Sequence, residues 1–121
     1  MNNAGVKNWF AKLSIGVYLL LVLLTLASWR SDSDSELCKL VIKDHKFEPS
    51  EIHVHANKRI ELIIENLDDS VEEFESRDLK REKIIPAHST VKIILPPLKQ
   101  GSYKFFGEFN EETAQGVIIV E

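Results

Sequence analysis

The clearest structural pattern in the chain lies at its C-terminal end, which reads Gly101-Ser-Tyr-Lys-Phe-Phe-Gly-Glu-Phe-Asn-Glu-Glu-Thr-Ala-Gln-Gly-Val-Ile-Ile-Val-Glu121. Tyr103, Phe105 and Phe106 favour a strand. Gly116 then opens the apolar run 117–120, whose length is typical of a buried strand. The stretch therefore predicts two strands joined by a short loop.

That loop is acidic, because Glu108, Glu111 and Glu112 lie close together in it. Like charges repel one another unless something neutralises them. One interpretation is a solvated hairpin loop, since runs of charge are usually solvated. The other is a loop that helps to bind a cation, and the residues of the loop alone leave both open.

The rest of the chain after residue 37 also reads as strands. Residues 51–55, 59–65 and 90–95 alternate between apolar and polar, with Leu40 to Ile42 and 71–76 as shorter strands. About seven short strands at this spacing predict an all-β sandwich or small barrel. Residues 77–83 are charged and are expected to hold one helical turn. The side chains predicted to face the core are Phe47, Ile52, Val54, Ile60, Leu62, Ile64, Phe74, Val91, Ile93, Leu95, Tyr103, Phe105, Val117 and Ile119, and Ile84 and Ile85 are expected to pack as well.

The N-terminal part has a different composition. Residues 13–29 carry no charge, Lys7 and Lys12 precede them, and the acidic run 31–36 follows. This asymmetry predicts that the C-terminal part lies outside the cytoplasm, in the periplasm or at the outer face of an inner membrane. The segment is a signal peptide cut after Ala27 or an uncleaved membrane anchor, somewhat short of the roughly 20 residues of a full span. The expected organisation is a targeting segment over 1–30, a polar linker over 31–37 and one domain over 38–121.

Charge and cysteine content exclude some classes of function. Without residues 1–29 the chain keeps 13 of its 15 basic residues and all 19 acidic ones, a formal charge of −6. This balance argues against nucleic acid and anionic lipid as partners and favours cations. Cys38 is the single cysteine, so no disulfide forms within the chain. It is expected to act as a small apolar residue in the first strand.

Three segments together resemble the cupredoxin-like superfamily. They are Phe47-Glu-Pro-Ser-Glu-Ile52, the segment from Asn66 through Asp69-Ser-Val-Glu-Glu-Phe74, and Gly101-Ser-Tyr-Lys-Phe105. The resemblance implies a Greek-key β-sandwich. Copper-carrying members hold their ion with His, Cys, His and usually Met. At those positions this chain has Glu72, Gly107, Asn110 or Glu111, and Thr113 or Ala114.

A narrower resemblance rests on Glu73-Phe-Glu-Ser76, Arg81-Glu-Lys83, Ile85-Pro-Ala87 and Phe106-Gly107. These motifs are similar to those of small cupredoxin-like proteins associated with bacterial iron permeases, in which carboxylates replace the blue-copper ligands. The resemblance implies an accessory protein of iron uptake with a permease as partner. His88 departs from the pattern, since glycine is common there. If the position requires a positive φ, the histidine is strained.

The ligand chemistry points in the same direction. A blue-copper site needs a thiolate and two imidazoles, which the closing loop lacks, whereas carboxylates suit harder ions such as ferric iron, manganese or calcium. The candidate metal ligands are Glu72, Glu73, Glu75, Glu108, Glu111 and His45. Strand alternation places Glu73 and Glu75 on one face and Glu72 on the other, so only a subset can reach one ion. His53 and His55 share an outward face and are expected to be solvent-facing.

Three functions are compatible with these residues. The first is a metal-handling accessory protein that binds iron or copper for a permease. The second is an interaction module that binds no metal and docks on transporter components. The third, a copper electron carrier, is disfavoured by the missing ligands. No nucleophile with an adjacent base is legible in the sequence, so no catalytic residue is predicted.

Overall fold

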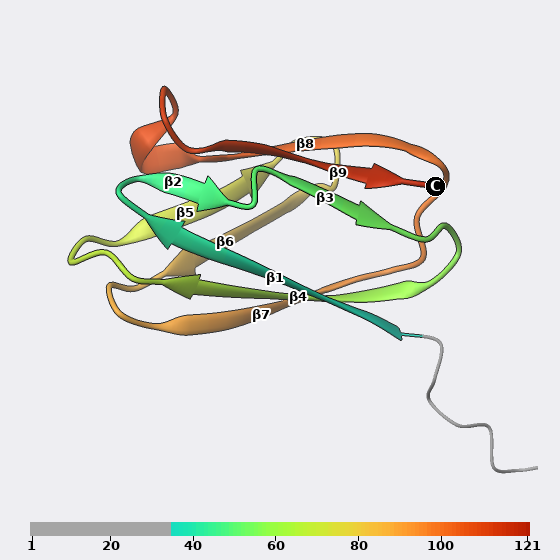
Figure 1. Ribbon diagram of the computed structural model, residues 1–121, viewed down its shortest axis with the longest axis horizontal. Helices are drawn as coiled ribbons and strands as arrows, with labels where there is room; N and C mark the ends of the chain where they lie inside the picture. Colours follow the sequence, from blue (N-terminus) through green and yellow to red (C-terminus); the bar gives the residue numbers. More distant parts are fainter. Residues whose placement is uncertain (1–34) are drawn as a thin grey trace, which may run out of the picture. The chain divides into compact units, whose positions relative to one another are not determined.

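Residues 35–121 form two β-sheets that face each other, as the computed structural model shows in Figure 1. The elements are β1 (Ser35–Lys43), β2 (Lys46–Glu48), β3 (Glu51–Val54), β4 (Arg59–Asn66), β5 (Glu72–Ser76), β6 (Arg81–Ile85), β7 (Thr90–Leu95), β8 (Gly101–Gly107), the 3-10 helix η1 (Glu108–Asn110) and β9 (Gln115–Val120). The structure describes residues 35–121, and the predicted targeting segment and most of the polar linker lie outside them. Among the described residues no helix is long and apolar enough to cross a membrane.

The sheets have four and five strands. The order is β2-β1-β4-β7 in one sheet and β3-β9-β8-β5-β6 in the other. Two pairs, β1 with β4 and β3 with β9, are parallel, and the remaining pairs are antiparallel. The predicted all-β sandwich is therefore confirmed, with nine strands in place of about seven.

The core lies between the sheets and follows from strand alternation. In β4, Ile60, Leu62 and Ile64 are fully buried while the residues between them are half-buried. Three aromatic rings join the sheets. Phe47 of β2 packs edge-on against Phe74 and Phe105 at centroid distances of 6.2 and 5.1 Å. Edge-to-face pairs add to the apolar burial, so these rings fix how the two sheets meet.

Several boundaries differ from the prediction. The first strand already begins at Ser35, so residues 35–37 belong to β1 and not to the linker. Residues 77–80 form a turn, and the residues that follow extend as β6, so the helical turn predicted over 77–83 is wrong. The outward side chains of this hairpin are charged, a composition that is also common in exposed helices. The pairing of β6 with β5 nevertheless makes the segment a strand.

The prediction of which side chains of the last strand face the core was also wrong. Ile118 and Val120 are buried, whereas Val117 and Ile119 are half-buried and face outward. A continuous apolar run has no alternation from which its inner face can be read, so pairing with β3 and β8 decides it. Ile84 is 47% exposed, and only Ile85 enters the core.

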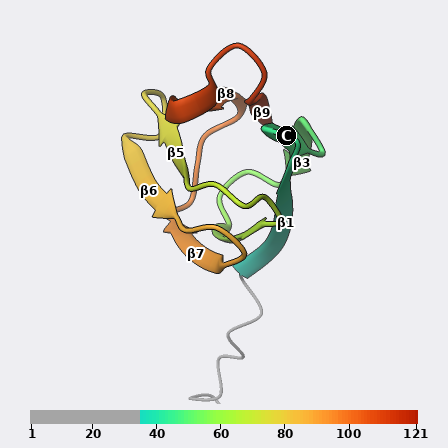
Figure 2. The ribbon, with the colours of Figure 1, turned by 90° about the vertical axis from the view of Figure 1, so that its left-hand side faces the viewer.

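Four connections meet at one end of the sandwich. Figure 1 shows the β1–β2 turn, the β4–β5 loop, the β6–β7 turn and the η1 loop together at its left side, and Figure 2 looks onto this end. Asn66 ties two of them together. Its amide donates to the carbonyl oxygens of Ser70 (2.8 Å) and Ile85 (3.1 Å), and its Oδ1 accepts from the Asp68 amide (3.0 Å). We call the end of the sandwich where these four connections meet the loop end.

Candidate functional site

The loop end is built around the buried carboxyl group of Glu72. Glu72 is 2% exposed, since it alternates inward with Phe74 on β5, as strand alternation predicts. Its Oε1 accepts hydrogen bonds from the backbone amides of Glu73 and Phe109, both at 2.9 Å. Its Oε2 accepts from Nδ2 of Asn110 at 2.7 Å. The carboxyl group thus connects β5 to the loop that begins with η1.

The four positions that resemble copper-ligand positions do meet here. Gly107 is buried, and a Cβ atom on it would lie 2.6 Å from Cδ of Glu72 and 2.7 Å from Cβ of Ala114. Asn110 reaches Glu72 directly, and its carbonyl oxygen accepts from the Ala114 amide at 2.8 Å. Of the alternatives that the sequence left open, Asn110 and Ala114 are the residues in contact with this site.

These residues do not fit a blue-copper ion. The set offers one carboxyl group, one amide, a glycine and an alanine where such an ion needs a thiolate and two imidazoles. Cys38 is buried in β1, and burial raises the pKa of its thiol, with the charge of Glu36 as a second cause. A protonated buried thiol is a poor metal ligand. The space that a ligand at position 107 would need is taken by Glu72.

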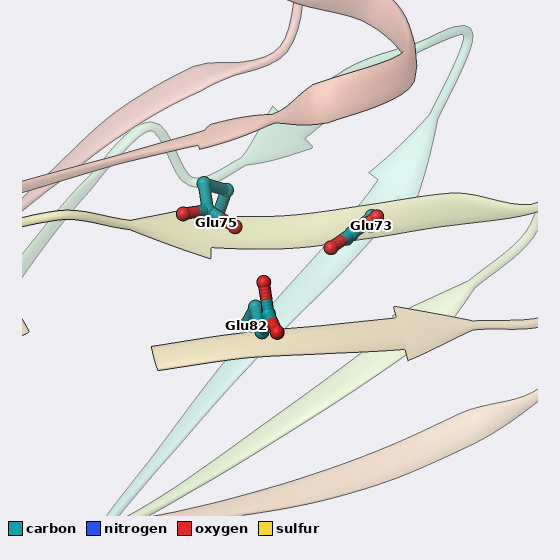
Figure 3. Close-up of side chains that lie close together, drawn as sticks. All are labelled: Glu73, Glu75 and Glu82. Atoms are coloured by element: carbon teal, nitrogen blue, oxygen red, sulfur yellow. The ribbon is translucent and has the colours of Figure 1, made fainter. Parts of the chain in front are cut away.

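A second group of carboxylates lies on the outer face of the five-stranded sheet. Glu73 and Glu75 project from β5, and Glu82 projects from β6 (Figure 3). Each offers one oxygen atom, and these three atoms lie within 4.8 Å of one another. The register of β5 and β6 explains why these carboxylates lie close together. Glu75 pairs directly with Glu82 across the hairpin, and Glu73 is two residues from Glu75 on the same face. We call these three residues the outer acidic cluster.

Within the described residues, the charge of the outer acidic cluster is not compensated by ion pairs. None of its three side chains forms an ion pair with a basic residue among residues 35–121. The pKa of Glu73 is raised, first by partial burial and then by the negative charges of Glu82 and Glu75. Like charges opposite each other on a sheet are destabilising. An oxygen-preferring cation would relieve that repulsion, and three carboxylates are a ligand set suited to it.

The other predicted ligands lie apart from this cluster. Glu108 and Glu111 are exposed in the η1 loop, and Glu108 contributes only through its charge, as a smaller cause of the raised pKa of Glu73. His45 lies in the β1–β2 turn at φ 58°, with its Nδ1 3.7 Å from Oδ2 of Asp68. Asp68 also accepts from the backbone amides of Asp44 and His45, which makes it the cap of this turn.

The remaining histidines also face carboxylates. His53 contacts Glu51 and Glu121, and His55 contacts Glu36. Their predicted outward direction is confirmed, since both are exposed. His88 has φ 54°, the positive value at which a histidine is strained, and its Nε2 lies 2.6 Å from Oδ1 of Asp69.

Sequence reasoning did not include Glu82 among the ligands. The residue was visible in the motif Arg81-Glu-Lys83, but as part of a segment expected to be helical. The available signal was the hairpin itself. Two short strands joined by the turn 77–80 would place Glu82 opposite Glu75.

Comparison with known proteins agrees with this fold. The family model described as cupredoxin-like domain matches residues 16–120. The protein RP394 of Rickettsia prowazekii (strain Madrid E), named as uncharacterized, is 56% identical over 82 residues. The match covers 68% of this chain and 66% of that protein, so the chain spans slightly less than two thirds of the relative's length.

Solved structures share the architecture at low identity. The metal-binding domain of the Cu(I)-exporting P-type ATPase CopA of Streptococcus pneumoniae D39, solved with Cu(I), superimposes with a TM-score of 0.65 at 13% identity, over 73% of this chain and 87% of that one. Auracyanin A, a blue copper protein of Chloroflexus aurantiacus, gives 0.63 at 11% identity, over 72% and 99%. At such identities the likeness concerns the fold alone. Together with the family match over residues 16–120, it leads to one conclusion: the chain belongs to the family of cupredoxin-like domains.

Proposed function

We propose that this domain is an extracytoplasmic, metal-handling accessory protein of iron uptake, and that its ion is bound by the outer acidic cluster. The observation that carries the proposal is the meeting of Glu73, Glu75 and Glu82 with no basic side chain from residues 35–121 paired to them. A sheet surface that gathers like charges loses stability unless a ligand compensates for it.

The ligand chemistry selects the class of ion. Three carboxylates provide hard oxygen donors, which favour ferric iron, manganese or calcium over Cu(I). The solved neighbours include copper-binding proteins, and copper remains the second ion to test. The similarity of Glu73-Phe-Glu-Ser76 and Arg81-Glu-Lys83 to proteins that accompany iron permeases favours iron, with a permease as partner.

The location outside the cytoplasm is part of the same proposal. It rests on the uncharged segment 13–29 with lysines before it and acidic residues after it. An accessory protein at the outer face of the membrane would meet iron before transport. The cluster lies on the outer face of the sheet, where Glu82 is exposed and Glu73 and Glu75 are half-buried, so an ion could pass to a partner without unfolding of the domain.

The test is thermal melting of the full chain and three variants with and without Fe(III)-citrate, Mn(II), Ca(II) and Cu(II). At an ion concentration one hundred times Kd, mass action adds about 2.7 kcal/mol to the free energy of unfolding. Glu75→Gln and Glu82→Gln should abolish most of the upshift in Tm. Glu61→Gln is the matched control, because Glu61 lies on a strand of the other sheet and contacts Lys92.

The pH dependence follows from Glu73. Its pKa is raised in the ion-free protein, so Glu73 is the carboxyl group expected to protonate early as the pH falls. Ion binding needs the deprotonated form and should weaken in acid. If no ion raises the Tm of the wild type, the proposal that this domain binds a metal ion is wrong. In that case the alternative, a docking module without metal, is retained.

A further inference from the structure

The loop end presents a disagreement between the family's copper chemistry and the residues of this chain. Glu72 is buried, yet no basic side chain among the described residues pairs with it. Burying a carboxyl group costs free energy unless it is hydrogen-bonded. Here three donors meet it, namely the backbone amides of Glu73 and Phe109 and the side-chain amide of Asn110.

Two of these donors come from the closing loop. Phe109 and Asn110 lie in η1, 37 and 38 residues beyond Glu72. The helix has no side-chain hydrogen bond at its N-terminal cap, so Glu72 provides the acceptor that its first turn otherwise lacks. The loop closes on itself through Gly107, whose amide donates to the carbonyl oxygen of Ala114 at 2.8 Å.

The same carboxyl group occupies the space of a ligand side chain. A Cβ atom at position 107 would lie 2.6 Å from Cδ of Glu72 and 2.8 Å from its Oε2. Carbon atoms do not approach so closely, so a larger residue at 107 and an extended Glu72 exclude each other. Glu72 therefore favours glycine at position 107, together with Ala114, whose Cβ atom would lie 2.7 Å from a Cβ there.

We propose that the Glu72 carboxyl group is an internal replacement for a metal ion at this end of the sandwich. It joins β5 to the closing loop through hydrogen bonds, as an ion would through ligands, and it leaves no room for copper there. The loop is consequently ordered without metal. This assignment is independent of ion binding by the outer acidic cluster, whose side chains lie on the opposite, outer face of the sheet.

The first experiment measures amide hydrogen exchange at Phe109 by NMR in the full chain, kept in mild detergent because of its apolar N-terminal stretch. In the wild type, exchange should be unchanged by EDTA and by Cu(II) or Cu(I). In Glu72→Ala the amide loses its acceptor, and its exchange should accelerate by about tenfold to a hundredfold. The amide of Ile118, in the inner strand β9 of the five-stranded sheet, reports whether the fold is retained.

Glu61→Gln is the matched control, because Glu61 lies on β4 in the other sheet, and the substitution should leave the exchange of Phe109 unchanged. If Glu72→Ala does not fold, Glu72→Asp is used instead. This substitution keeps a carboxyl group but withdraws it by one methylene from Asn110, and it should accelerate exchange in the same loop. Unchanged exchange in a folded variant overturns the proposal.

The second experiment tests the occupied space. Gly107→Ala should lower the Tm of the wild type. It should lower the Tm less when Glu72 is replaced by Asp, because the close contact with residue 72 is then relieved and that with Ala114 remains. Additive effects of the two substitutions would contradict the proposed exclusion. Copper that slows the exchange of Phe109 in the wild type, but not in Glu72→Asp, would make Glu72 a ligand and also refute it.

Discussion

Asn66 holds two of the connections at the loop end together, and Asn66→Ala tests how much this side chain contributes to stability. The side chain is fully buried and makes no contact with solvent. Its two amide hydrogens serve the carbonyl oxygens of Ser70 and Ile85, and the Pro86 oxygen at 3.3 Å shares one of them. Its Oδ1 accepts from the Asp68 amide. Alanine leaves these backbone groups without their partner.

The expected loss of stability follows from these hydrogen bonds. Three independent hydrogen bonds at about 1 kcal/mol each predict a loss of about 3 kcal/mol in the free energy of unfolding. For a domain of this size each kcal/mol lowers Tm by about 4–8 °C, which predicts a decrease of about 12–24 °C. Since small domains have only about 5–15 kcal/mol in total, this single amide is a large part of the stability.

The assay is chemical denaturation together with thermal melting followed by circular dichroism. Leu67→Ala is the control, because Leu67 adjoins Asn66 in the chain, is 46% exposed and should change stability by no more than about 0.5 kcal/mol. A loss below about 1 kcal/mol for Asn66→Ala would refute the reasoning, since water would then replace all three bonds at little cost.

Two further predictions concern histidines. Hydrogen bonds to Glu121 and then to Glu51 raise the pKa of His53 above 6.5, so the folded state holds that proton more tightly than the unfolded chain. The stabilisation by protonated His53 is fully present below about pH 6.5 and is lost as the pH rises through the folded pKa. The Tm difference between wild type and His53→Gln should therefore shrink from pH 6 to pH 8. A difference that grows over this range would contradict the prediction. His88 has φ 54°, so His88→Gly should be more stable than His88→Ala by about 1 kcal/mol in denaturant titrations, because both lose the contact with Asp69 and only alanine keeps the strained Cβ; equal stability would rule out strain at this position.

Much of the fold could be predicted from local chemistry. Alternation in residues 51–54 and 59–65 identified two inner faces correctly, because a strand that is buried on one side must alternate. The same alternation separates Glu72 from Glu73 and Glu75, since successive side chains of a strand point to opposite faces. The absence of a thiolate in the closing loop follows from the amino-acid sequence directly, and with it the poor fit to blue copper.

What depended on tertiary structure were the register of neighbouring strands and the contacts between segments far apart in the chain. The outer acidic cluster exists because the β5–β6 register places Glu82 opposite Glu75, and register is set by hairpin geometry that charged residues do not reveal. The bonds from Glu72 to Phe109 and Asn110 span 37 and 38 residues, and no local pattern indicates which buried carboxyl group will meet which loop. The amino-acid sequence thus determined that the closing loop is acidic and lacks the thiolate and the imidazole that a blue-copper ion needs. Only the pairing of β5 with β6 and the contact of β5 with the η1 loop decided that the inward glutamate holds this loop, while Glu82 joins Glu73 and Glu75 on the outer face.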